Sequence, residues 1–177
     1  MKKVLSIIVL FITFIFIYFL QSNFFNWFNI AGIKPNLFIV LALFIGLFLG
    51  KIYGITSGII MGLLLDLFIG KRMGINAIPL GLAGFLGGAF TKNFSKDSRM
   101  TIMLITFGAT LICESALYIT QIAIFRTQLE ILSFLKIVLI ETLFNAIIII
   151  IIYPLIEKTG DLLMRIFREK KILTKYY

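Results

Sequence analysis

Six apolar runs, separated by short polar or glycine-containing segments, dominate the pattern of the chain. A helix that crosses a bilayer perpendicularly needs about 20 residues, so the second run is short. Residues 37–69 are nevertheless too many for one span. The pattern therefore predicts two helices joined by a tight turn at residues 50–54, where two glycines can adopt positive φ angles. The six predicted helices cover residues 4–20, 37–50, 52–69, 75–91, 101–125 and 132–153.

Composition shows which environment these helices need. The chain is 60% hydrophobic and 14% charged, and its mean hydropathy is +1.08. A soluble domain has roughly 45–50% apolar and about 25% charged residues, so the predicted fold class is an all-α membrane protein with six transmembrane helices in a compact bundle. No linker rich in Ser, Gly or Pro divides the 177 residues. We therefore expect a single domain over residues 1–177, with a short basic cytoplasmic tail from about residue 157.

The distribution of lysine and arginine predicts the orientation of the chain. If the N-terminus is cytoplasmic, twelve of the 17 basic residues lie on that side and five on the other: Lys34, Lys71, Arg72, Arg126 and Lys136. Basic residues accumulate in cytoplasmic loops, so both termini are predicted to be cytoplasmic. The net charge of +9 then follows from this bias. The tail is expected to lie on anionic membrane lipids, and we expect no nucleic-acid partner.

Several kinds of catalytic site are excluded by the residue inventory. The chain has no histidine, and its one cysteine, Cys113, lies inside the fifth apolar run. Disulfides, Cys/His zinc sites and histidine-based nucleophile relays are therefore excluded. Asp66 is the one aspartate inside a run, whereas an intramembrane aspartyl protease needs two, and no phosphate-binding glycine loop is present. We expect no enzyme activity, no cofactor and no metal site.

Small residues form a regular stripe on the third predicted helix. Gly54, Gly58 and Gly62 follow one another at steps of four, and residues four apart share one helix face. Such a stripe lets a neighbouring backbone approach closely. We favour packing against other helices of the same chain over a groove for a partner helix.

Three carboxylates fall inside predicted spans: Asp66, Glu114 and Glu141, with Asn145 one turn beyond Glu141. A charged side chain at the centre of a membrane helix costs about 2.5–3.5 kcal/mol on insertion scales, so we expect these groups to form a buried polar network. One interpretation is that each is protonated, or paired with one of Lys136, Arg72, Ser115 or Thr142, and holds helices together. The other is a ligand or ion site.

The order of several short motifs resembles the MreD family of bacterial rod shape-determining membrane proteins. The matching elements are KPN at 34–36 with Pro35 and Asn36, the glycines of SGIIMG, LLLDL at 63–67, Gly70, and MGINA at 73–77 with Gly74. The later half agrees through Glu114, Asn145 and Pro154. The resemblance covers residues 34–88 best.

This resemblance implies a non-enzymatic component of the cell-elongation machinery in the bacterial cytoplasmic membrane. Such a component is a scaffold that binds the bitopic protein MreC and links the MreB cytoskeleton to peptidoglycan synthases. The family also looks similar in fold to the substrate-binding subunits of energy-coupling-factor vitamin transporters, which gives one alternative function. Against that alternative, the first helix is bulky almost throughout and lacks the small residues that such subunits use for docking. The other alternative is a small proton-coupled exchanger that uses Asp66 or Glu114.

Overall fold

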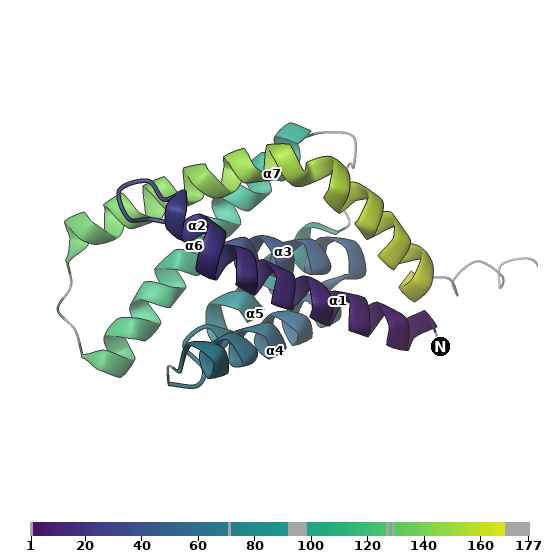
Figure 1. Cartoon of the computed structure of the whole chain (residues 1–177), viewed down its shortest axis with the longest axis horizontal. Helices are drawn as coiled ribbons and strands as arrows, with labels where there is room; N and C mark the ends of the chain where they lie inside the picture. Colours follow the sequence, from purple (N-terminus) through teal and green to yellow (C-terminus); the bar gives the residue numbers. More distant parts are fainter. Residues whose placement is uncertain (1, 71, 92–98, 127, 129, 169–177) are drawn as a thin grey trace, which may run out of the picture.

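The computed structural model describes residues 2–70, 72–91, 99–126, 128 and 130–168, and it is built from helices (Figure 1). Within these residues, four stretches are long and apolar enough to cross a membrane: Ile7–Trp27, Lys51–Ile69, Met100–Phe125 and Ile131–Leu155. Two shorter apolar helices complete the set. The elements are α1 (Lys2–Phe19), the π-helix η1 (Leu20–Phe24), α2 (Phe25–Trp27), α3 (Leu37–Leu49), α4 (Lys51–Ile69), α5 (Ala77–Phe90), α6 (Arg99–Phe125) and α7 (Ile131–Arg168).

Each predicted run contains a helix, but the first and last helices extend further than expected. The first continues through η1 and α2 to Trp27. The last passes through Pro154 and continues to Arg168, so the first part of the expected tail is helical. Proline removes one backbone hydrogen bond and commonly bends a helix without ending it, and Figure 1 shows α7 bending in its C-terminal half. Residues 169–177 lie outside the described residues, so their contact with lipid stays a prediction.

The turn between α3 and α4 is shorter than the predicted five residues. Gly50 alone separates the two helices, with φ 99° and ψ 175°. Its N–H donates to the carbonyl of Gly46 at 2.8 Å, and its carbonyl accepts from Gly54 at 3.0 Å. A positive φ of this kind is readily adopted only by glycine, so one residue reverses the chain and brings α4 back along α3.

Glycines bring the backbones of α3, α4 and α5 into direct contact, and Figure 1 shows where these three helices lie together. A Cβ built on Gly54 or Gly58 would lie closer than 3.0 Å to backbone atoms of α5, and one on Gly62 would meet the backbone at Ala77 in the same way. The contact is reciprocal, because a Cβ on Gly84 would meet the backbone of Gly54. The stripe of the third predicted helix therefore faces α5.

The remaining helices pack around this three-helix unit mainly through large side chains. Phe14 of α1 is 1% exposed, and its ring lies 5.2 Å from that of Phe38 and 6.2 Å from that of Phe68. At the other end of the chain, Gly160 of α7 lies against the ring of Phe48. Most other large side chains of α1 are exposed, which in a membrane is the surface that contacts lipid.

The glycine contacts predict that the same replacement of glycine by alanine changes the stability of the protein differently at two positions. Gly58→Ala places a methyl group against the backbone of Leu80, and overpacking of this kind typically costs about 1–3 kcal/mol. Gly108→Ala is the matched control, because no atom lies within 4 Å of the added Cβ and alanine favours a helix over glycine by about 1 kcal/mol. We expect the melting temperature in detergent to fall for Gly58→Ala and to stay constant or rise for Gly108→Ala. Equal melting temperatures would show that the backbones do not touch at Gly58.

Candidate functional site

Asp66 lies near the end of α4, is 0% exposed, and binds the loop that follows its own helix. Its Oδ2 accepts the N–H of Gly74 at 2.8 Å, and its Oδ1 accepts the side-chain amide of Asn76 at 2.7 Å. The backbone N–H of Asn76 reaches both oxygens, at 3.2 and 3.3 Å. The carboxylate therefore fixes the segment that leads into α5.

Two glycines give this loop the backbone conformation it needs. Gly70 has φ 68° and caps α4, and Gly74 has φ 101°. No atom lies within 4 Å of a Cβ built at either position, so space alone would admit a side chain. Glycine is needed at both positions because of the positive φ angle. At Gly74, the residue with this φ angle also donates its N–H to Asp66.

A second polar cluster joins three helices at the N-terminal end of α3. Asn36 caps α3, since its side-chain oxygen accepts from Ile39 N at 3.4 Å. The Nδ2 of Asn36 donates to Glu114 Oε1 on α6 at 3.0 Å, and its backbone N–H donates to Asn145 Oδ1 on α7 at 2.8 Å. Asn145 Nδ2 then donates to Thr110 Oγ1 at 3.3 Å. Pro35, the residue before Asn36, is also buried.

Glu141 lies one helical turn before Asn145 on α7, and its carboxyl group is close to that of Glu114. Glu114 is 5% exposed and Glu141 is 8% exposed.

The structure divides the predicted polar network in two. Among the described residues, Asp66 bonds to Gly74 and Asn76, whereas Glu114 and Asn145 bond to Asn36, with Glu141 close to Glu114. The expectation of one network that joins Asp66 to the other three residues is therefore wrong. Asp66 lies in the last turn of α4, so its carboxylate reaches the loop that follows this helix and not the other polar residues.

No hydrogen bond joins the carboxylates to their expected partners among the described residues. Arg72 donates to the carbonyl of Ile124 at 3.4 Å and lies 5.8 Å from the ring centroid of Phe125. Ser115 donates to its own helix at Leu111, and Lys136 is exposed. Thr142 is buried, and its hydroxyl has no hydrogen-bond partner in the part of the chain that the structure describes. The actual partner, Asn36, was singled out in the sequence only as part of the KPN motif.

A protein-family model described as rod shape-determining protein MreD matches residues 1–165, a stretch that contains both polar clusters. The chain belongs to the MreD family. No curated protein and no solved structure matches it. Membership implies a role in rod-shape determination, and the four long apolar helices indicate an integral membrane protein.

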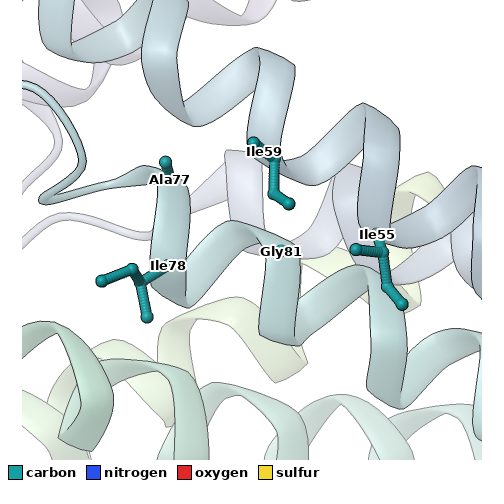
Figure 2. Close-up of a pocket in the computed structure, with 5 residues that line it drawn as sticks. All are labelled: Ile55, Ile59, Ala77, Ile78 and Gly81. Atoms are coloured by element: carbon teal, nitrogen blue, oxygen red, sulfur yellow. The ribbon is translucent and has the colours of Figure 1, made fainter.

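One apolar groove lies between α4 and α5 of this MreD-family chain, with a volume of about 260 Å³. Figure 2 shows Ile55 and Ile59 extending from α4, and Ala77, Ile78 and Gly81 lying along α5. None of these five side chains is polar or titratable. Within the described residues, no group of three or more His, Cys, Asp or Glu side chains is placed to hold a metal ion.

Substitution of Asp66 tests whether its carboxylate holds the loop. Asp66→Leu leaves the N–H donors of Gly74 and Asn76 without an acceptor, at about 1–3 kcal/mol for each buried unsatisfied group. Asp66→Asn keeps one acceptor oxygen and should cost less. We expect melting temperatures in detergent in the order wild type, Asp66→Asn, Asp66→Leu, while Leu67→Ala, at an exposed neighbouring position, stays close to wild type. A leucine variant as stable as the asparagine variant would contradict this role.

Asn36 can be tested with two replacements that both keep a helix cap. Asn36→Ser removes the donor to Glu114, and Asn36→Asp replaces that donor with a second carboxyl group directly beside Glu114. We expect Asn36→Asp to be the less stable protein at neutral pH, since like charges in a buried site repel strongly. The measurement is the melting temperature of each variant. If Asn36→Asp matched Asn36→Ser, Asn36 would act only as a cap.

Proposed function

We propose that this protein is a non-enzymatic membrane scaffold of the bacterial cell-elongation machinery, which binds MreC and links MreB to peptidoglycan synthases. The observation that carries the proposal is the family match over residues 1–165. The proposal concerns the bacterial cytoplasmic membrane, with contacts to membrane lipids and with both termini in the cytoplasm.

The hydrogen bonds of the buried polar groups support a structural role. Asp66 accepts from three donors in one loop, and Asn36, Asn145 and Thr110 bond to one another or to Glu114. These groups join helices and loops that a scaffold must hold in fixed positions. The use of Asp66 in the loop also argues against its service as the proton carrier of an exchanger.

The lengths of α3 and α5 support a six-span arrangement in which these two helices begin below the outer membrane surface. They contain 13 and 14 residues, so each rises only about 20 Å against a hydrocarbon core of about 30 Å. Irregular backbone at membrane depth is tolerated only where the protein satisfies its polar groups. The Asn36 cluster and Asp66 do this at the N-terminal ends of α3 and α5. We also propose that this six-span fold is similar to that of the substrate-binding subunits of energy-coupling-factor vitamin transporters.

Partner capture and cell shape test the scaffold role together. We expect Asp66→Leu and Gly58→Ala to lose co-purification of MreC in proportion to their loss of folded protein, because both disturb how α4 packs against α5 and the loop before it. Cells that depend on these variants should become round, whereas cells with Gly108→Ala should remain rods. The measurements are the amount of MreC that co-purifies from native membranes, the melting temperature, and the ratio of cell length to width.

A different result would separate scaffold from exchanger. If Asp66→Asn folded normally and captured MreC fully, yet supported no rod growth, the scaffold role of Asp66 would be rejected. Loss of capture by a variant with normal stability would instead place Asp66 in the partner contact itself.

A further inference from the structure

Two arginines from different loops lie at the C-terminal end of α6. Arg72, in the loop between α4 and α5, donates from Nη1 to the carbonyl of Ile124 at 3.4 Å, and its guanidinium lies 5.8 Å from the ring centroid of Phe125. Arg126 directly follows Phe125, and its backbone N–H donates to the carbonyl of Ile122 at 2.8 Å. Figure 1 shows the end of α6 and the loop between α4 and α5 at one end of the molecule.

Capping of α6 explains only part of this arrangement. The C-terminal end of a helix presents unpaired carbonyl groups and a partial negative charge, and Arg72 satisfies one of these carbonyls. The side chain of Arg126 bonds to none of them in the part of the chain that the structure describes. Its φ of 52° is left-handed, at a position where glycine or asparagine is usual. An arginine in this conformation is an outlier, and such outliers point to a function of the side chain.

Neither guanidinium group is neutralised within the protein. Both arginines are exposed, and no ion pair joins them to a carboxylate among the described side chains. Glu130, the acid nearest to Arg126 in the sequence, accepts instead from the hydroxyl of Ser133 at 2.9 Å. A guanidinium group has five N–H donors, and Arg72 uses one of them for the carbonyl of Ile124. Most donors of the two arginines are therefore available to an anion from outside the chain.

The position of the arginines indicates which anion they meet. Two of the stretches that are long enough to cross a membrane end at Ile69 and Phe125, so Arg72 and Arg126 lie just beyond the ends of these stretches. The polar headgroups of a bilayer lie directly outside its hydrocarbon core. Phe125 is 47% exposed and Met73 is 60% exposed, so apolar side chains flank the arginines. This combination suits a lipid better than a soluble anion.

We propose that Arg72 and Arg126 together bind the phosphate group of an anionic phospholipid. Guanidinium groups pair with phosphate oxygens in a planar, bidentate geometry, and basic sites between membrane helices bind anionic headgroups in this way. The phosphate bridges the loop after α4 and the end of α6, and so joins the α3–α5 unit to α6. The proposal goes beyond the scaffold function, and it depends neither on MreC nor on the orientation of the chain.

Native mass spectrometry of the purified full chain tests the site. The probes are phosphatidylglycerol and phosphatidylcholine with the same acyl chains, which differ in net charge. We expect the wild type to bind phosphatidylglycerol more tightly, and this preference to fall several-fold in Arg72→Gln/Arg126→Asn and less in each single variant. Higher salt should weaken the preference, because both cations are exposed. A wild type without the preference, or a double variant that keeps it, would overturn the proposal.

Lys51→Gln is the matched control, because Lys51 is also an exposed cation beside an aromatic ring, 5.3 Å from the centroid of Phe85, at the other end of α4. We expect this variant to keep the preference of the wild type. If it lost as much as the double variant, net charge alone would govern lipid binding and the site would be rejected. Inorganic phosphate is the third probe, and displacement of phosphatidylglycerol by equimolar phosphate would assign the arginines to a soluble anion instead.

Arg126→Asn keeps the test valid if the double variant does not fold. Asparagine adopts positive φ angles more readily than most residues, and the replaced side chain has no hydrogen bond among the described residues. We therefore expect Arg126→Asn to melt at the temperature of the wild type in the absence of added lipid. A folded Arg126→Asn protein with an unchanged lipid preference would exclude Arg126 from the site and overturn the proposal.

Discussion

Backbone N–H groups at the N-terminal ends of α3 and α5 impose the constraint on which the rest of the structure depends. Both helices rise only about 20 Å, because they contain 13 and 14 residues. In the six-span arrangement proposed above, the segments before them lie at membrane depth and must satisfy their polar groups within the protein. Asn145 accepts the N–H of Asn36, and Asp66 accepts those of Gly74 and Asn76. Buried polar side chains occur in this apolar chain because these helix starts need acceptors.

Backbone contact between helices explains how such short helices are held. Lipid tails are as apolar as leucine, so helix association in a membrane relies on close packing more than on the hydrophobic effect. Gly54 and Gly58 on α4 and Gly84 on α5 remove the side chains that would separate the two backbones. The same packing brings the end of α4 beside the start of α5, which is where Asp66 finds its donors. The glycine stripe of α4 and the buried Asp66 therefore both serve the packing of α4 against α5 and the loop before it.

Much of this fold could be predicted from the sequence, because α1, α3, α4, α5, α6 and α7 each overlap an apolar run, and periodicity reports such runs directly. The run boundaries could not predict that α7 continues beyond Pro154, since proline usually marks a helix end and only packing around it shows otherwise. The polar residues themselves were visible as rare charges in apolar segments. Their grouping was not, because Asn36 lies 78 residues from Glu114, and spacing along the chain does not report which helices are neighbours.

The two acidic sites illustrate how the surroundings of a carboxyl group determine its role. Asp66 receives only N–H donors from a loop whose glycines hold positive φ angles, so both of its oxygens act as acceptors that hold this loop against the end of α4. Glu114 accepts from the side-chain amide of Asn36, whose backbone N–H donates to Asn145. The first arrangement stabilises one loop, whereas the second joins α6 and α7 to the start of α3. Buried carboxyl groups in this chain can therefore hold either a local turn or separate helices, although the side chains carry the same functional group.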